Sequence, residues 1–357
     1  MGGFVASQAL RLASNLVLTR LLFPEAFGLM ALVTVFVMAL VMLSDIGTGP
    51  AIMGSRRGDD PAFLDTAWTI QILRGAILWL AALAAAPLLA RFYGEPALAA
   101  YLSVAALSLL ITGLNPTRAE TANRHLRAGR VTLIDLAAQS VGIAVAVGLA
   151  WATGSVWALV ASNLAAALAQ LLLLDALLPG PRNRPRWEAA AARELIHFGK
   201  WIFLATLCGF AIGQADKVIL GRYLDLGHFG LYNIAWFLAS VPFLLGGVVA
   251  RRALIPVYRD SPPAASALNR ARIRRLRAGA LAALLALSAL LAFGGDAVVG
   301  LLYDPRYRAA GGIVVLIAAT QGPALLILTC DQAALAAGDS RRFFAFTLAR
   351  AALVTAG

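Results

Sequence analysis

Two polar residues four positions apart, Arg11 and Asn15, interrupt the first apolar stretch of the sequence. Positions i and i+4 of a helix lie on one face, so the guanidinium and the amide are expected to point the same way. A charged side chain in the middle of a membrane span is costly, which makes it a functional candidate. A guanidinium also binds phosphate through two parallel hydrogen bonds. We therefore interpret Arg11 and Asn15 as ligands of an anionic substrate, with a buried structural pair as the alternative.

A second set of candidates consists of Asp45, at the end of the second apolar stretch, and Arg74, within the third. Opposite charges on successive helices favour a structural ion pair, because either charge alone would be costly to bury. Arg74 is also a candidate substrate ligand, and Asp45 a candidate for ion coupling. Gly47, Gly49 and Pro50 follow Asp45 and are expected to end its helix. The alternative for this segment is a mobile gate on the cytoplasmic side.

Asp216 and Lys217 are adjacent in a later apolar stretch. Neighbouring residues on a helix point about 100° apart, so the two charges cannot both face one cavity squarely. Lys217 is the candidate for substrate binding, and Asp216 is the candidate for ion coupling or a structural ion pair. Both lie toward the outer end of their stretch, so the competing interpretation is that they extend to the membrane surface.

Prolines interrupt two further apolar stretches. Pro242 lies in the eighth, and Pro323 lies at the centre of the tenth, which also contains Asp331. A proline weakens a helix locally, which suits a hinge in an alternating-access transporter. Pro242 and Pro323 are therefore hinge candidates, although prolines are also ordinary in membrane helices. Asp331 joins the candidates for ion coupling or a structural ion pair.

The elements that must position these residues are long apolar helices. The sequence of 357 residues is 61% hydrophobic and 13% charged, with a mean hydropathy of +0.80, which excludes a water-soluble fold. A helix needs about 20 apolar residues to cross a bilayer. The sequence predicts an all-α polytopic membrane protein with about eleven spans, at 3–19, 27–44, 67–90, 97–115, 131–150, 156–178, 201–219, 229–250, 279–301, 310–336 and 343–357.

The formal charge of +12 would suggest nucleic-acid binding in a soluble protein. The basic residues are distributed unevenly, however, because one set of alternate loops holds 21 of them and the other set holds five. This alternation is the positive-inside pattern. It predicts a multi-pass protein of the inner, cytoplasmic membrane with a cytoplasmic N-terminus, and no nucleic-acid partner.

An internal repeat organises the predicted spans. Residues 18–29 (LTRLLFPEAFGL) match residues 220–231 (LGRYLDLGHFGL) at six of twelve positions. The matched segments join spans 1 and 2 and spans 7 and 8, so the repeat has six helices and returns in the same orientation. We expect an N-terminal lobe at 1–179, a cytoplasmic amphipathic linker at 180–200 and a C-terminal lobe at 201–357. The second lobe is expected to be incomplete, because the sequence ends within its fifth span.

Enzyme signatures are absent from the sequence. Its three histidines, His125, His197 and His228, fall in three different loops on two sides of the membrane, so no metal site is predicted. We find no phosphate-binding glycine loop, nucleophile elbow or zincin pair. The sequence therefore predicts a protein that is not an enzyme and has no cofactor. Its energy would come from the membrane potential or from a coupling cation, H⁺ or Na⁺.

Several segments resemble one family over most of the chain: LTRLLFPEAFGLMAL, APLLARFYGEPAL, GSVWALV and, most specifically, QADKVILGR followed by FGLYNIA. They are similar to the polysaccharide transporter (oligosaccharide flippase) family of the multidrug/oligosaccharidyl-lipid/polysaccharide exporter superfamily. The resemblance implies two six-helix lobes around a central cavity. It also implies translocation of polyprenyl-diphosphate-linked glycans from the cytoplasmic to the outer leaflet. The implied partners are the lipid-linked glycan, membrane lipids and glycan polymerase or assembly proteins.

Two alternative functions remain open at this stage. A multidrug exporter of the same superfamily would favour an acidic cavity for cationic drugs, whereas Arg11 and Lys217 are cationic. A membrane glycosyltransferase or polymerase would need catalytic carboxylates or a sizeable outer loop. The outer turns are short, and their acidic residues are Glu25, Glu95, Asp225 and Asp304.

Overall fold

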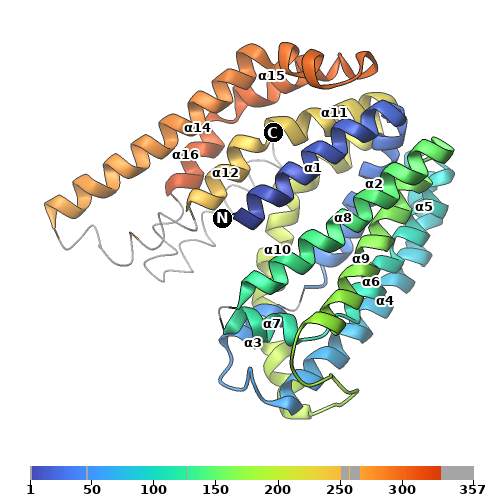
Figure 1. Cartoon of the computed structure of the whole chain (residues 1–357), viewed down its shortest axis with the longest axis vertical. Coiled ribbons are helices and arrows are strands. Elements are labelled where there is room, and N and C mark those ends of the chain that lie inside the picture. Colours follow the sequence, from blue (N-terminus) through green and yellow to red (C-terminus); the bar gives the residue numbers. More distant parts are fainter. Residues whose placement is uncertain (1, 46, 126, 251–256, 258–265, 331–357) are drawn as a thin grey trace. The chain divides into compact units, whose positions relative to one another are not determined.

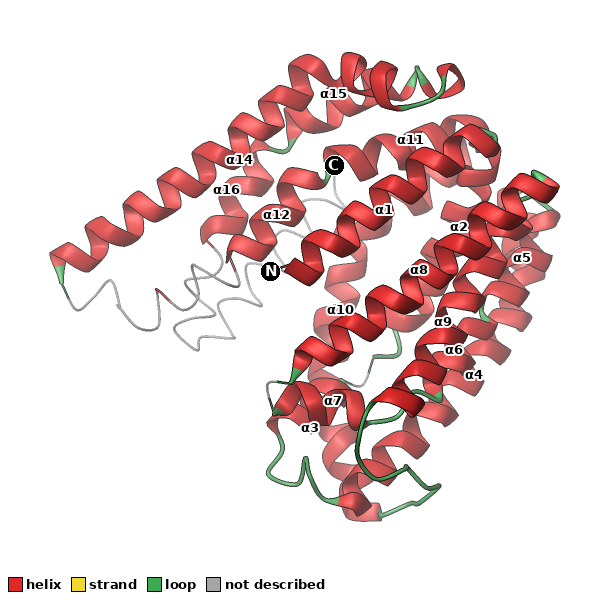
Figure 2. Ribbon diagram, viewed as in Figure 1, coloured by secondary structure: helices red, strands yellow, loops and turns green. Residues whose placement is uncertain are grey.

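The computed structural model describes residues 2–45, 47–125, 127–250, 257 and 266–330. Within these ranges every regular element is a helix (Figure 2). The chain divides into two compact units, unit 1 (Met1–Leu226) and unit 2 (Gly227–Gly357). The expectation of an all-helical membrane fold is confirmed.

Most helices of unit 1 follow one another with short connections, and the longest of these, residues 178–188, joins α9 to α10 (Figure 1). Unit 1 contains α1 (Gly2–Leu21), α2 (Pro24–Met42), α3 (Thr48–Gly54), α4 (Pro61–Tyr93), α5 (Ala97–Ala105), α6 (Leu107–Gly113), α7 (Arg118–Arg124), α8 (Ala128–Thr153), α9 (Trp157–Leu177) and α10 (Ala189–Tyr223). Unit 2 contains α11 (Leu226–Ala239), which begins at the boundary, α12 (Val241–Val249), α14 (Ala267–Leu302), the short turn η2 (Pro305–Tyr307), α15 (Ala310–Thr320) and α16 (Gly322–Cys330).

The ends of the helices follow from local sequence. Pro61 begins α4, and the side chain of Asp60 caps it by accepting a hydrogen bond from the backbone N–H of Ala62 at 3.0 Å. Helix α4 ends at Gly94 and α8 at Gly154, with φ angles of 73° and 59°. Glycine adopts this left-handed conformation without steric cost, so both helices stop sharply before the next one begins.

Six helices in the described residues are long and apolar enough to cross a membrane, or up to eight if each of two bent pairs is one span. Helix α1 is long enough but is not among them, because polar residues such as Arg11 and Asn15 lower its apolarity. The span predicted at 97–115 is broken into α5 and α6. The span predicted at 343–357 lies outside the described residues. The total of eleven spans and the six-helix repeat stay predictions.

Helix α10 begins at Ala189, twelve residues before the span predicted at 201–219. Its first turns are rich in alanine, which favours helix. Ala191, Ala192 and Leu195 are buried, and Ala191 and Leu195 pack in a cluster with residues of α3 and α4. The second half of the predicted linker is therefore a helical extension whose apolar face is covered by protein. The predicted lobe boundaries stay predictions, with the compact unit 1 running through α10.

Helices α8 and α9 lie side by side along their length (Figure 1). Gly142 of α8 makes this close approach possible. A Cβ atom at Gly142 would lie 2.8 Å from the Cβ of Ala166 and 2.9 Å from the carbonyl oxygen of Ser162. Helix α1 packs on the same helix α8, where Ser7 Oγ donates to Gln139 Oε1 at 2.7 Å. Helix α8 thus connects α1 to α9.

The contact at Gly142 predicts a stability effect with a matched control in the same helix. Gly142→Val should force α8 and α9 apart and lower the free energy of unfolding by about 1–3 kcal/mol. Gly148→Val should be tolerated, because a Cβ at that exposed glycine meets nothing within 4 Å. Thermal unfolding of both variants in detergent measures the difference. Equal unfolding temperatures for the two variants would contradict the packing described for α8 and α9.

Candidate functional site

The guanidinium of Arg74 ties α4 to the C-terminal end of α2. Its Nε donates to Ser44 Oγ at 3.0 Å, and its Nη2 donates to the carbonyl oxygen of Val41 at 2.7 Å. The last carbonyls of a helix have no partner within the helix and carry partial negative charge, so a cation is well placed there. The local structure thus satisfies Arg74 mainly through neutral acceptors.

Asp45 lies close to Arg74, as the sequence predicted. The distance from Arg74 Nη1 to Asp45 Oδ1 is 4.0 Å, and the Asp45 side chain is 37% exposed. The same carboxylate accepts the backbone N–H of Gly47 at 2.8 Å, where the chain turns with a φ angle of 62°. Long, partly exposed ion pairs contribute little stability. Asp45 therefore shares its charge between the turn and Arg74.

A cavity of about 260 Å³ adjoins Arg74. It is lined by two carboxylates, Asp45 and Glu120, together with the amide of Gln71. Glu120 comes from α7 and approaches α3 closely at Gly49, where an added Cβ would lie 3.1 Å from the carboxyl group. The sequence analysis missed Glu120, because the residue belongs to a polar stretch between spans. The small residue Gly49, four positions after Asp45, was the available signal for a close approach.

Lys217 is buried in α10, with 7% of its surface exposed, whereas the adjacent Asp216 is half-buried. Lys217 Nζ donates to Gln214 Oε1 at 3.1 Å, one turn earlier on the same helix. Gln214 Nε2 in turn contacts the sulfur of Met38 on α2 at 3.4 Å. The different burial of Asp216 and Lys217 agrees with their separation around the helix.

Arg11 and Asn15 lie on α1, which packs against α8. Arg11 is exposed. The side-chain oxygen of Asn15 is buried and has no hydrogen-bond partner among the described residues. Buried polar atoms are rarely left unsatisfied, so this acceptor is suited to a donor from a ligand. Asn15, Arg74 and Lys217 share no hydrogen bond or ion pair with one another in the described part of the chain.

The two hinge candidates lie beside helix breaks in unit 2. Pro242 is near the start of α12, directly after the break that ends α11, and Pro323 is in the first turn of α16. Helices α15 and α16 meet at an angle of 48°. Gln321 Nε2 donates to the carbonyl oxygen of Ala239 at 2.7 Å and so connects the two breaks. Asp331 lies outside the described residues.

No group of three or more His, Cys, Asp or Glu side chains within the described ranges could hold a metal ion. The candidate site consists of guanidinium, ammonium and amide groups on long helices, and of carboxylate groups at Asp45 and Glu120, which lie outside the long helices. These groups can bind anions, sugars and monovalent cations.

The family model described as "Polysaccharide biosynthesis protein" matches residues 17–310. The chain belongs to this family. The resemblance found in the sequence is thereby confirmed.

Two curated relatives are similar to this member of the polysaccharide biosynthesis family. The teichuronic acid biosynthesis protein TuaB of Bacillus subtilis (strain 168) is 19% identical over 77% of the chain and 56% of its own length. The lipopolysaccharide biosynthesis protein WzxC of Escherichia coli (strain K12) is 22% identical over 70% of the chain and 51% of its own length.

The chain thus spans about half the length of the curated relatives it matches. A solved structure supports the fold of this polysaccharide biosynthesis protein. It is the inward-facing conformation of a multidrug resistance MATE family transporter of the MOP superfamily, with a TM-score of 0.64 and 15% identity. The similarity covers 96% of the chain and 84% of the transporter. The chain therefore has a transporter-like fold and belongs to a multi-pass membrane protein family.

The geometry around Arg74 predicts an order of stability for two variants. Arg74→Met should lower the free energy of unfolding by about 1–3 kcal/mol, because Ser44 and Val41 both lose a charged donor. Asp45→Asn should cost less than about 1 kcal/mol, because the ion pair is long and exposed. Unfolding in detergent, followed by tryptophan fluorescence, measures both. If Asp45→Asn destabilises as much as Arg74→Met, the ion pair dominates and this account of Arg74 is wrong.

Proposed function

We propose that the full-length protein is a flippase that translocates a polyprenyl-diphosphate-linked oligosaccharide from the cytoplasmic to the outer leaflet by alternating access. It acts without chemical conversion of its substrate and is not an enzyme. Membership of the polysaccharide biosynthesis family supports the glycan part of this proposal. The names of the two curated relatives refer to the biosynthesis of teichuronic acid and of lipopolysaccharide.

The observation that carries the proposal is the pair of polar groups on α1. Arg11 supplies a fixed positive charge within a membrane-length helix, and Asn15 supplies a buried acceptor without a partner in the described residues. A diphosphate needs the positive charge of Arg11, because its own negative charge is most costly in the middle of the membrane. A sugar hydroxyl can donate a hydrogen bond to the side-chain oxygen of Asn15. Lys217 and Arg74 are further candidate contacts for the same anionic, hydroxyl-rich substrate.

The uneven distribution of basic residues supports a position in the inner membrane with the N-terminus in the cytoplasm. In this orientation the connections before α4, α8 and α10 face the cytoplasm. The glycan would be loaded from this side. A glycan polymerase or assembly protein would receive it on the other side.

A multidrug exporter is the second candidate, and the inward-facing transporter structure favours it through fold alone. A cationic drug would need acidic groups in its path. Arg11, Arg74 and Lys217 instead present positive charge, which favours an anionic headgroup. A glycosyltransferase or polymerase remains the least supported candidate, because the turns between α1 and α2, α4 and α5, and α8 and α9 leave no room for a catalytic domain.

Energy coupling is proposed to use the small cavity beside Arg74. Asp45 and Glu120 carry two negative charges against one positive charge at Arg74. The one excess negative charge could be neutralised by one monovalent cation, H⁺ or Na⁺. Asp216 and Asp331 remain alternative sites for the coupling cation.

Replacement of Arg11 tests the substrate. In proteoliposomes containing the full-length protein, Arg11→Ala should abolish flipping of a polyprenyl-diphosphate glycan, because a neutral side chain cannot hold the diphosphate. Arg11→Lys should retain part of the rate, since an ammonium binds phosphate as a point charge. Arg20→Ala, at the end of the same helix, is the matched control and should flip normally. Flipping by Arg11→Ala at the wild-type rate would remove Arg11 from the headgroup site.

Replacement of Glu120 and Asp45 tests the coupling. With an imposed H⁺ or Na⁺ gradient, the wild-type protein should flip faster than without it. Glu120→Gln and Asp45→Asn should each remove this stimulation by at least about tenfold while leaving the rate without a gradient unchanged. The measurement is the initial rate of flipping with and without each gradient. Full stimulation in both variants would rule out this cavity as the cation site.

A further inference from the structure

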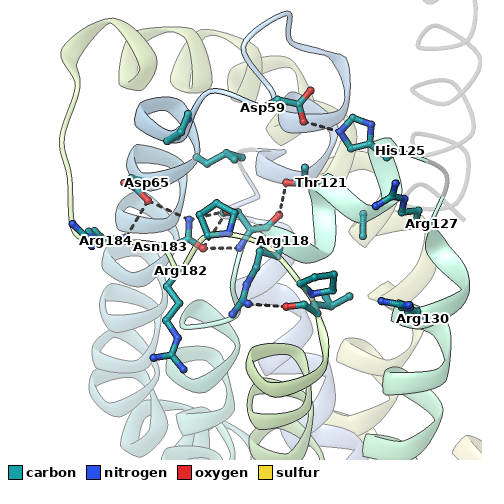
Figure 3. A pocket seen from close by; sticks show the side chains of 18 of the residues that line it. Asp59, Asp65, Arg118, Thr121, His125, Arg127, Arg130, Arg182, Asn183 and Arg184 are labelled. Atoms are coloured by element: carbon teal, nitrogen blue, oxygen red, sulfur yellow. Dashed lines mark hydrogen bonds and ion pairs between the residues drawn. The ribbon is translucent and has the colours of Figure 1, made fainter.

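A cavity of about 1240 Å³ lies where residues 178–186 meet α7 and the N-terminal ends of α4 and α8 (Figure 3). All of these elements belong to unit 1. The cavity has an excess of positive charge, because six arginines line it and only two carboxylates do. The arginines are Arg118, Arg127, Arg130, Arg182, Arg184 and Arg186, and the carboxylates are Asp59 and Asp65. We call it the arginine cavity.

Both carboxylates are already engaged by protein donors. Asp59 accepts from Arg124 Nε at 3.1 Å and lies 2.8 Å from His125 Nε2. The hydrogen bond from His125 lowers the pKa of Asp59, so the carboxylate is ionised at neutral pH. Asp65 accepts the backbone N–H of Arg184 at 3.0 Å. Neither aspartate is therefore paired with the guanidinium group of Arg127 or Arg130.

The segment that carries three of the arginines is fixed to α4 and does not depend on a ligand for its position. The backbone N–H groups of Arg186 and Glu188 donate to the hydroxyls of Thr69 and Thr66, at 3.0 and 3.1 Å. Glu188 also accepts from Arg57 at 2.9 Å. These contacts hold the arginines of the segment beside the cavity at little further entropic cost on binding.

One arginine forms part of the cavity wall. Arg118 is only 9% exposed, and its Nη1 donates to the carbonyl oxygen of Leu178 at 2.7 Å. Its Nη2 pairs with the carboxylate of Asp175. Its Nε is buried and has no partner among the described residues. A buried donor without an acceptor is costly. The Nε–H group of Arg118 is therefore suited to donate to a ligand in the cavity.

Three other arginines have their guanidinium groups available. The side chains of Arg127, Arg130 and Arg184 are exposed, and within the described ranges no carboxylate or carbonyl group accepts from them. Arg127 and Arg130 come from the start of α8, whereas Arg184 comes from the segment after α9. Arg127 and Arg130 lie near each other on one side of the cavity, whereas Arg184 lies away from them on the other side (Figure 3). Two neighbouring guanidinium groups favour an anion with several charged oxygens, such as a diphosphate.

The position of the cavity favours a lipid as the carrier of this anion. It lies at the ends of α8 and α9, and it includes the apolar side chains of Leu64 and Leu178. Further along α8 and α9, Leu133 is 67% exposed and Leu172 is 60% exposed. These side chains can contact a lipid tail while the headgroup lies at the level of the arginines.

We propose that the arginine cavity is a cytoplasmic binding site for the diphosphate headgroup of a polyprenyl-linked lipid. The inference rests on the proposed function for its direction, because the cavity would collect the headgroup before translocation. The site is separate in the sequence from Arg11 and Asn15. It uses positions on the side of unit 1 that the positive-inside pattern assigns to the cytoplasm.

Direct binding to the purified full-length protein in detergent tests the proposal, with geranylgeranyl diphosphate as the probe. The triple variant Arg127→Ala, Arg130→Ala, Arg184→Ala should bind the probe at least about tenfold more weakly than the wild type. The matched control removes the same charge from exposed arginines of α14, as Arg272→Ala, Arg274→Ala, Arg275→Ala, and should bind normally. If the triple variant does not fold, Arg127→Gln with Arg130→Gln replaces it.

Competition distinguishes the sources of phosphate. Inorganic pyrophosphate should compete only weakly, and phosphatidylglycerol at equal concentration should leave most of the probe bound. Unchanged probe binding in the triple variant, equal loss in the α14 control, or full displacement by phosphatidylglycerol would each overturn the proposal. Because binding is measured without transport, a protein that binds the probe through the cavity but flips no glycan would contradict only the proposed function.

Discussion

The structure depends on one constraint, which is that the hydrocarbon of a bilayer offers no hydrogen bonds to polar groups. Every polar side chain within a membrane-length helix must therefore find an acceptor or donor in the protein, reach the surface or bind a ligand. Arg74 finds acceptors in the protein, the carbonyl oxygen of Val41 on the neighbouring helix α2 and the hydroxyl of Ser44 just after that helix. Asn15 has no such partner in the described residues. This difference separates a residue that holds helices together from one that is suited to a substrate.

The same constraint explains where the charged clusters lie. Several arginines that have carboxylate partners, such as Arg57 with Glu188 and Arg124 with Asp59, lie in or beside the connections between the long helices, where water and opposite charges are accessible. These connections are nevertheless well ordered by contacts with α4. A polar, fixed surface at the ends of apolar helices suits an amphiphilic substrate, because the charged headgroup and the lipid tail require different environments.

Much of the fold could be predicted from the sequence, because spans of about 20 apolar residues are a local signal. The proximity of Asp45 and Arg74 could also be predicted, since they lie on successive spans. Features that depend on tertiary packing could not. The early start of α10 requires α3 and α4 to cover Ala191 and Leu195, and Glu120 approaches the Arg74 cavity only because α7 folds back against Gly49. The arginine cavity likewise requires three separated segments to meet, whereas the sequence shows only a general excess of basic residues.

The central claim is that fixed positive charge in the protein lowers the barrier for an anionic, lipid-linked glycan. The most direct measurement compares two lipids with the same sugar and the same polyprenyl tail, one with a diphosphate linkage and one with a neutral ether linkage. Their flipping by the full-length protein can be followed in proteoliposomes with a membrane-impermeant reagent that modifies exposed sugar. The account predicts that the diphosphate lipid is flipped at least about tenfold faster than the neutral lipid. Equal rates for the two lipids would contradict it.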